Sequence, residues 1–112
     1  MKFTIRPAVR EDILRQYRYY LIEQNAETTA ARFLAAVQDA MKQVCKHPEI
    51  GTPKALVHSA LAGLRSWPVK GFPAIRIYYL RSDLAIRIVR VLHGKRDIDS
   101  MLEEDEAADS ES

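Results

Sequence analysis

Cysteine is nearly absent from this sequence: Cys45 is the only one among 112 residues. A single thiol cannot form an intramolecular disulfide, and it cannot assemble a metal site made of several cysteines. Cys45 falls within a helical pattern of apolar residues, where a buried, unreactive thiol is commoner than a nucleophile. We therefore expect neither a disulfide framework nor cysteine chemistry.

Motifs for metals, phosphates and nucleophiles are also missing. The three histidines, His47, His58 and His93, show no ligand spacing, and the sequence has neither a glycine-rich phosphate loop nor a nucleophile elbow. Each histidine has an ordinary structural interpretation, at a helix end, in a loop and at a strand end, respectively. We predict no metal site and no cofactor.

Long apolar runs are absent as well. None is long enough to cross a bilayer, and residues 1–6 lack the apolar middle and the cleavage site of a signal peptide, so we expect a cytoplasmic protein. The length and an apolar content of 47% fit one domain with one core. We assign residues 1–102 to this domain and residues 103–112 to an acidic, disordered tail.

Positive and negative charges are unevenly distributed. Residues 103–112 hold six acidic groups and no basic one, so residues 1–102 carry 17 basic and 9 acidic groups, a net charge of +8. A cationic body of this kind attracts acidic partners, either nucleic acid or an acidic protein segment. The alternative interpretation is a solubilising surface, which is common in small domains.

Apolar periodicity in the first half predicts a short strand and two helices. Residues 3–6 alternate as a strand does, and Pro7 suits the first turn of a helix. Helical spacing runs from Ala8 to near Asn25, and a second helical pattern starts at Glu27 and stops before Pro48. We expect these helices to form an antiparallel hairpin, followed by a loop over residues 52–62.

The second half predicts three more strands, at residues 64–69, 74–80 and 84–92, in a mainly antiparallel sheet with the hairpin on one face, which is an α+β fold. Pro68 indicates an edge strand or a bulge. Arg90 breaks the alternation set by Ile86 and Ile88, so either a bulge precedes it or it lies past the covered part of the sheet. The expected core includes Phe33, Leu34, Val37, Met41, Ile75, Ile77, Ile86 and Ile88.

Four segments, in this order and spacing, resemble the ParE toxins of type II toxin–antitoxin systems, a branch of the RelE/ParE superfamily. The resemblance extends over residues 3–98. Its segments are Arg6-Pro7-Ala8 with Asp12-Ile13-Leu14, then His47-Pro48-Glu49-Ile50-Gly51, then Gly63-Leu64-Arg65-Ser66-Trp67-Pro68-Val69, and finally Ile88-Val89-Arg90-Val91-Leu92-His93-Gly94-Lys95-Arg96-Asp97-Ile98.

The resemblance implies a toxin that inhibits DNA gyrase by binding, without bond-breaking chemistry. It also implies a ParD-like antitoxin whose acidic, amphipathic segment wraps the toxin in a hetero-oligomeric complex. We expect no membrane association and no sequence-specific nucleic-acid binding by the toxin alone. Target contact is assigned to Arg65, Arg90, His93, Lys95 and Arg96, and antitoxin contact to Tyr17, Tyr20, Arg76 and Tyr78.

Basic side chains of the strands and strand ends are expected to converge on the uncovered side of the sheet. They are Arg65, Arg76, Arg87, Arg90, His93, Lys95 and Arg96. The alternative for Arg65, Arg90 and Arg96 is a structural role, in which they pair with Asp97, Asp99 or the sheet edge.

Two other functions remain open. A RelE-like, ribosome-dependent messenger RNA endoribonuclease needs a positioned acid and base besides positive charge. His93, Tyr78 and Tyr79 are acid–base candidates, but they do not make a complete set. The chain is otherwise a toxin-fold protein with another target, or a degenerate one that only binds its antitoxin.

Overall fold

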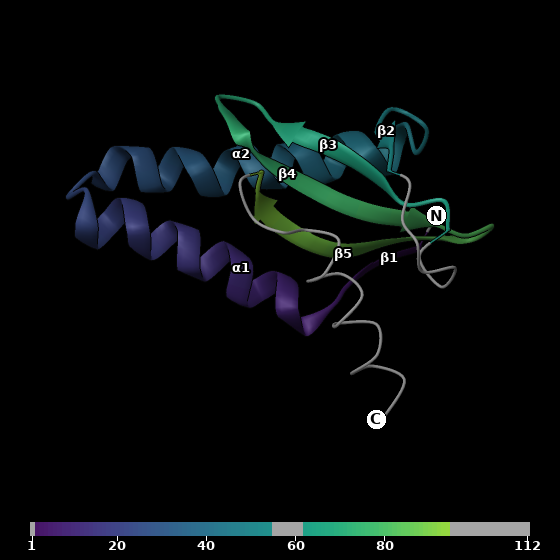
Figure 1. Cartoon of the computed structure of the whole chain (residues 1–112), viewed down its shortest axis with the longest axis horizontal. Helices are drawn as coiled ribbons and strands as arrows, with labels where there is room; N and C mark the ends of the chain where they lie inside the picture. Colours follow the sequence, from purple (N-terminus) through teal and green to yellow (C-terminus); the bar gives the residue numbers. More distant parts are fainter. Residues whose placement is uncertain (1, 55–61, 95–112) are drawn as a thin grey trace.

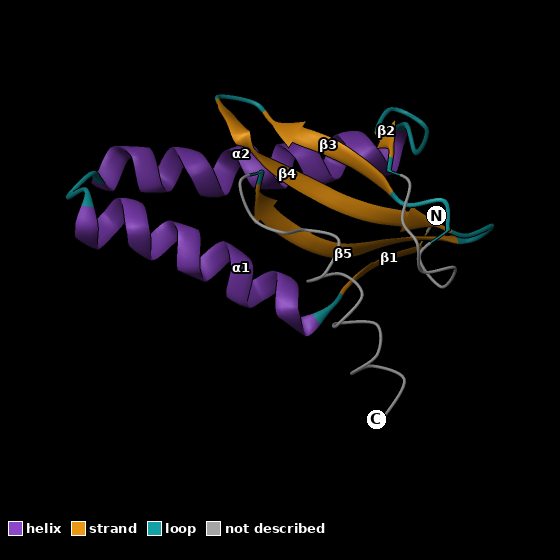
Figure 2. Cartoon of the chain, viewed as in Figure 1, coloured by secondary structure: helices purple, strands orange, loops and turns teal. Residues whose placement is uncertain are grey.

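The computed structural model describes residues 2–54 and 62–94, which form a helical hairpin and a five-stranded sheet (Figures 1 and 2). The sheet order is β1-β5-β4-β3-β2; β1 runs parallel to β5, and the other pairs are antiparallel. The predicted α+β class with an N-terminal strand is confirmed. The elements are β1 (Lys2–Ile5), α1 (Pro7–Arg18), the π-helix η1 (Tyr19–Glu23), α2 (Glu27–Lys46), β2 (Thr52–Pro53), β3 (Arg65–Val69), β4 (Phe72–Arg81) and β5 (Ala85–His93).

The hairpin begins as the sequence predicts but contains a π-helical turn. Pro7 occupies the first turn of α1, where its missing N–H needs no partner. The predicted helix to near Asn25 is confirmed as a helical segment that ends at Glu23, but the α-helix proper ends at Arg18 and the next turn is wider. Its closing bond runs from the Gln24 N–H to the Tyr19 carbonyl, 3.1 Å away. A left-handed Asn25 (φ 47°) then turns the chain into α2.

The main core lies between the hairpin and one face of the sheet. Seven of the eight expected core residues are buried there, and Leu34 is half-buried and packs against them. Tyr20, Phe33 and Phe72 pack their rings together with centroids 5.4–5.5 Å apart, joining η1, α2 and the start of β4. This aromatic contact fixes the far end of the hairpin on the sheet.

Strand irregularities decide which side chains reach the core. The pairing of β3 with β4 shifts between Pro68 and Val69, and β3 lies between β4 and β2, so of the two predicted alternatives the bulge is confirmed and the edge strand is not. In the pairing of β4 with β5, Tyr78 lies opposite Arg90 and Tyr79 opposite Ile88, which leaves Val89 as an extra residue. This second bulge precedes Arg90 and resolves the broken alternation of β5.

The segment predicted as a loop after α2 contains a short strand. Residues 52–62 were expected to form a loop, but Thr52 and Pro53 pair with Ser66 and Arg65 as the edge strand β2. The acidic tail, residues 103–112, lies outside the described residues. In the part of the chain that the structure describes, no helix has the length and apolar content needed to cross a membrane.

Candidate functional site

Arg90, a predicted target contact, lies inside the molecule and forms an ion pair with Asp12 of α1. Its Nε donates to Asp12 Oδ2 at 2.7 Å and its Nη2 to Oδ1 at 2.6 Å. The Val91 N–H donates to the same carboxylate at 3.1 Å. Both side chains are buried, at 8% and 1% exposure. A paired geometry with several hydrogen bonds is what a buried charge requires.

Asp12 occupies this place because β1 is shorter than β5. The parallel pairing ends at Ile5 and Ile88, and the Arg6 N–H makes a last bond to the Ile88 carbonyl. Beyond this point β5 has no strand beside it, and Asp12 accepts the Val91 N–H that a longer β1 would have paired. The sequence reasoning found an unexplained Arg90 but did not find its partner. The signal was that Arg90 occupies a position where the strand pattern predicts a buried side chain. A buried guanidinium requires an acidic partner from another element.

Arg65, the second predicted target contact, holds the loop that follows α2. Its Nη1 donates to the carbonyl oxygens of Gly51 and Glu49, at 2.7 and 3.2 Å. Tyr79 holds the same loop: its hydroxyl donates to the Pro48 carbonyl at 2.9 Å and accepts the Gly51 N–H at 2.8 Å. The motif at residues 47–51 is therefore a loop anchored to β3 and β4.

The position of the Tyr79 hydroxyl explains why residue 51 is a glycine, and its burial explains the shifted pKa of Tyr79. A Cβ at Gly51 would lie 2.5 Å from the Tyr79 hydroxyl oxygen, so the close approach requires glycine. Burial raises the pKa of Tyr79 above its ordinary value of 10.0, against smaller lowering effects of the Gly51 hydrogen bond and the Arg65 charge. The phenol therefore remains neutral and can donate and accept at once.

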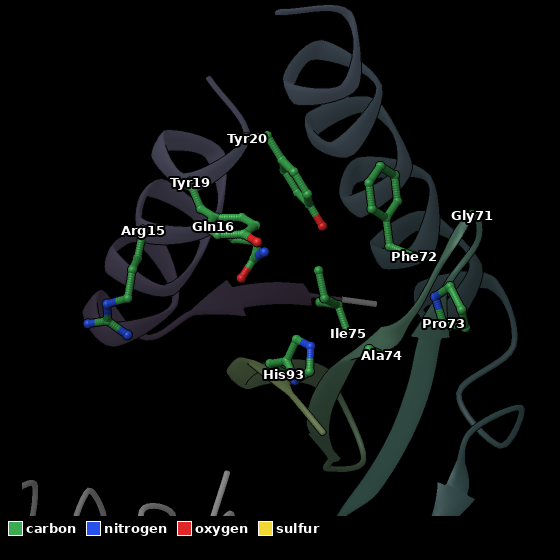
Figure 3. Close-up of a pocket in the computed structure, with 10 residues that line it drawn as sticks. All are labelled: Arg15, Gln16, Tyr19, Tyr20, Gly71, Phe72, Pro73, Ala74, Ile75 and His93. Atoms are coloured by element: carbon green, nitrogen blue, oxygen red, sulfur yellow. The ribbon is translucent and has the colours of Figure 1, made fainter. Parts of the chain in front are cut away.

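His93 lines an open cleft between the hairpin and the start of β4, which we call the aromatic cleft. Its volume is about 560 Å³, and its other side chains of interest are Arg15, Gln16, Tyr19, Tyr20 and Phe72. Figure 3 shows Gln16 and Tyr20 reaching from the helical side toward Ile75 and His93 on the sheet side. The π-helix forms part of its wall, and such turns are frequent at functional sites.

A second concave surface, the β1–α2 groove, is almost entirely apolar. It has a volume of about 510 Å³, and it is lined by Phe3, Ile5, Gln38, Met41, Lys42, Cys45 and Lys46. Phe3 and Ile5 are 38% and 40% exposed although they belong to the sheet face that carries the core. Burial raises the pKa of the Cys45 thiol above its ordinary value. Sequence reasoning treated these residues as strand and core and missed the groove.

The opposite face of the sheet, the helix-free face, holds the remaining predicted antitoxin contacts. Tyr78 is buried in a cluster with Leu64, Val89 and Leu92. Arg76 lies on the same face, and its Nε and Nη2 donate to the hydroxyl and the carbonyl of Ser66 at 3.0 and 3.3 Å. Tyr17 and Tyr20, by contrast, pack against the core on the helical side.

The predicted site residues therefore do not converge on one surface. The expectation of a single cationic array on the uncovered side is wrong, because Arg65 and Arg90 turn toward the α2 loop and α1, whereas Arg76 lies on the helix-free face. The alternation of strand side chains divides these arginines between the two faces. Lys95 and Arg96 lie outside the described residues, as does His58. Among the described residues, no three His, Cys, Asp or Glu side chains are grouped to hold a metal ion.

This architecture defines a small cationic α+β protein with concave apolar surfaces, a class suited to binding. A family model described as the ParE toxin of the type II toxin–antitoxin system, parDE, matches residues 3–98. The chain therefore belongs to the ParE toxin family. It is a ParE-type toxin of a type II toxin–antitoxin system, and such a system includes an antitoxin partner.

Solved structures show the same fold. A chain of the chromosomal ParDE toxin–antitoxin system from P. aeruginosa is 19% identical with a TM-score of 0.58, and the match covers 83% of this chain and 95% of that chain. A YoeB/ParE toxin from Agrobacterium tumefaciens is 18% identical with a TM-score of 0.53, and the match covers 83% of this chain and 98% of that chain. No curated protein matches the sequence.

Proposed function

We propose that this toxin acts in the cytoplasm by binding and inhibiting DNA gyrase, and that a small ParD-like antitoxin neutralises it. Membership of the ParE family is the observation that carries the proposal. RNA cleavage has less support, because two basic residues that could stabilise phosphate charge, Arg65 and Arg90, are engaged by backbone carbonyls and by Asp12. Target contact by His93, Lys95 and Arg96 stays a prediction, and for Arg65 and Arg90 the contacts favour a structural role.

The β1–α2 groove has the chemistry that an acidic, amphipathic antitoxin segment would match. Phe3, Ile5 and Met41 offer apolar contacts, and Lys42 and Lys46 supply positive charge beside them. β1 is at the edge of the sheet that the described strands form, and none of them pairs with its outer side, where an added strand would pair. The described residues carry 15 basic and 7 acidic groups, and this charge attracts an acidic segment from a distance.

Ile5 offers a sharp test of this groove. Ile5→Glu should weaken binding of the product of the neighbouring reading frame by about tenfold or more, since a charge replaces an apolar contact. Leu84→Glu is the matched control, because Leu84 is 80% exposed and does not line the groove. Binding is measured by calorimetry on the purified chains. Equal affinity of the Ile5→Glu and Leu84→Glu variants would place the antitoxin elsewhere.

RNA cleavage is the second candidate, and the aromatic cleft is the observation that favours it. Tyr20 and His93 are side chains of the acid–base type, and Arg15 is a basic side chain that lines the same cleft. One experiment separates the two functions. The chain is expressed with and without the neighbouring gene, and growth, plasmid supercoiling and messenger RNA integrity are followed.

Loss of supercoiling with intact messenger RNA, repeated with purified gyrase and purified chain, is the expected result. Unchanged supercoiling with messenger RNA cleaved on ribosomes would overturn the gyrase proposal and favour cleavage. Unchanged growth together with tight antitoxin binding would identify a degenerate toxin, and unchanged growth without such binding would reject the proposal as a whole.

A further inference from the structure

Three large apolar side chains of the first helical segment are exposed. Leu14 of α1 and Tyr19 and Ile22 of η1 are 45%, 42% and 70% exposed. They line one concave surface together with four charged side chains of the same segment, Glu11, Arg15, Arg18 and Glu23. Only six large apolar side chains of the described residues are exposed, and three of them lie here. Such a group on one side of a helix indicates a contact with another protein.

The π-helical turn aligns the residues of this surface. In a regular α-helix, a residue eight positions along points about 80° away from the first, because eight residues make about 2.2 turns. The wider turn η1, closed by the bond from the Gln24 N–H to the Tyr19 carbonyl, absorbs part of that rotation. Residues eight positions apart across the junction of α1 and η1 therefore lie nearly in line, as Leu14 and Ile22 do on this surface.

Two pairs of residues on this surface share the same spacing and nearly the same midpoint. Leu14 and Ile22 are eight positions apart and centred on residue 18, and Arg15 and Glu23 are eight positions apart and centred on residue 19. A second copy packed antiparallel about a twofold axis at residues 18–19 therefore brings Leu14 against Ile22 of the second copy, and Arg15 against its Glu23. Each contact occurs twice, once on either side of the axis. One symmetry operation thus matches apolar side chains and opposite charges together.

We propose that this surface, which we call the α1–η1 patch, binds a second copy of the chain, so that the free protein forms a homodimer through its first helical segments. A twofold interface uses the same surface of both copies, which must therefore be complementary to itself. The α1–η1 patch meets this requirement, because it supplies both members of each apolar pair and of each charged pair. Charge complementarity thus favours a second copy as the occupant.

Arg18 and Tyr19 lie at the proposed axis, where the two copies approach each other most closely. Arg18 of one copy comes opposite Tyr19 of the other, and a guanidinium over a phenol ring is a favourable contact. The Gln24 Nε2 donates to the Tyr19 hydroxyl at 2.9 Å, which helps to hold that ring. The two Arg18 side chains repel each other, and only three apolar side chains come from each copy. We therefore expect a weak dimer that dissociates on dilution.

The α1–η1 patch is distinct from the β1–α2 groove. The patch is lined from α1 and η1 and the groove from β1 and α2, and they share no residue. The homodimer therefore does not rest on the proposed antitoxin contact. The aromatic cleft, by contrast, shares Arg15 and Tyr19 with the patch, so formation of the dimer would change access to that cleft.

Sedimentation equilibrium of the full chain, without any partner, measures the dimer. Between about 1 μM and about 500 μM the mass should rise from that of one chain toward that of two. Ile22→Glu should weaken the dimer at least tenfold, because it removes an apolar contact on both sides of the axis. Leu84→Glu is the matched control, since Leu84 is 80% exposed and lies outside the patch. A native chain that stays monomeric, or an equal effect of the two variants, would overturn the proposal.

Charge reversal tests the antiparallel pairing of Arg15 with Glu23. Arg15→Glu alone and Glu23→Arg alone should each weaken the dimer several-fold, because each brings like charges together twice. The double variant should recover most of the loss, since it restores opposite charges in exchanged positions. Thermal melting of the single variants identifies any loss of dimer that comes from a loss of folding. A double variant that is folded but no better than the weaker single variant would reject this pairing.

Disulfide cross-linking locates the axis. In a Cys45→Ser background, Arg18→Cys should oxidise to a covalent dimer, because residue 18 lies beside its own copy. Glu11→Cys is the control: it lines the same patch but lies about 20 Å from its copy in the antiparallel arrangement. Equal cross-linking of both variants would overturn the assigned axis. A monomeric native chain whose Ile22→Glu variant binds purified gyrase or the antitoxin less tightly would assign the patch to that partner and overturn the homodimer.

Discussion

Two arginines of the sheet are held in the fold by different means. Arg90 of β5 is buried and forms an ion pair with Asp12, whereas Arg65 of β3 is half-buried and donates to the carbonyls of Gly51 and Glu49. At the β5–α1 junction a charge leaves water and requires an opposite charge. At the junction of β3 with the loop after α2, the Arg65 side chain keeps part of its contact with water. Neutral carbonyl acceptors are therefore enough for it.

The comparison shows how an arginine predicted for binding becomes part of the framework. Both side chains hold a connection at the end of an element: Arg90 holds α1 against β5, and Arg65 holds the loop that leaves α2. The energetic consequences of mutation should nevertheless differ, because removing one partner breaks a buried ion pair at the first junction and only neutral hydrogen bonds to carbonyls at the second.

Removal of Asp12 should have the largest effect. Asp12→Ala removes the carboxylate that accepts from the Arg90 guanidinium and from the Val91 N–H, at a cost of about 3–5 kcal/mol in the free energy of unfolding. Urea unfolding at neutral pH measures it. The double variant Asp12→Leu with Arg90→Met should recover most of the loss, because no charge remains buried. A loss below about 1 kcal/mol for Asp12→Ala would contradict the importance of this pair.

Gly51→Ala should come next, with a loss of about 1–3 kcal/mol, because the added methyl group meets the Tyr79 ring and hydroxyl. The measurement is again the free energy of unfolding. Gly94→Ala provides a matched control, since among the described residues its Cβ would meet only the Ala74 carbonyl oxygen, at 3.4 Å. Equal losses for both variants would show that the effect is general to glycine replacement.

Tyr79→Phe should cost about 1–3 kcal/mol, because the Gly51 N–H loses its acceptor and the Pro48 carbonyl its donor. The raised pKa of Tyr79 also predicts a pH dependence. The phenol stabilises the fold below its unfolded pKa near 10.0, and this contribution is lost as pH rises through the folded pKa.

Unfolding at about pH 8 and about pH 11 should therefore show a smaller alkaline loss for Tyr79→Phe than for the native chain. Tyr19→Phe is the control, because the Tyr19 side chain is exposed and its hydroxyl accepts a bond from Gln24 at the surface. If Tyr79→Phe does not reduce the loss of stability at alkaline pH, that loss comes from other ionisable groups.

The smallest effect is expected for Arg65→Ala, about 1 kcal/mol, since water replaces part of what the half-exposed side chain donates. Growth inhibition is measured beside stability. If the variant keeps native toxicity and loses only this small amount of stability, Arg65 has no role beyond holding the loop. Loss of toxicity at almost native stability would restore it as a target contact and separate it from Arg90.

The order and type of most elements could be predicted because apolar periodicity reports directly on burial. The strand patterns around Ile77 and Ile88 and the helical stripe through Phe33 and Val37 all face the main core. Phe3 and Ile5 show the limit of this reasoning. The alternation predicts correctly which face of β1 they occupy, but how far they are exposed depends on where α2 lies.

The sequence by itself determined the α+β architecture, the helical hairpin and the resemblance to ParE, and it reduced Pro68 to an edge strand or a bulge, because each rests on local spacing or on short motifs. Only the tertiary structure decided that η1 is π-helical, that Asp12 meets Arg90 across 78 positions, and that Arg76 and Tyr20 lie on opposite sides of the sheet. Such contacts join residues far apart in the chain, and any of several acids would have satisfied the charge of Arg90. The choice among them is made by where β1 stops and α1 begins.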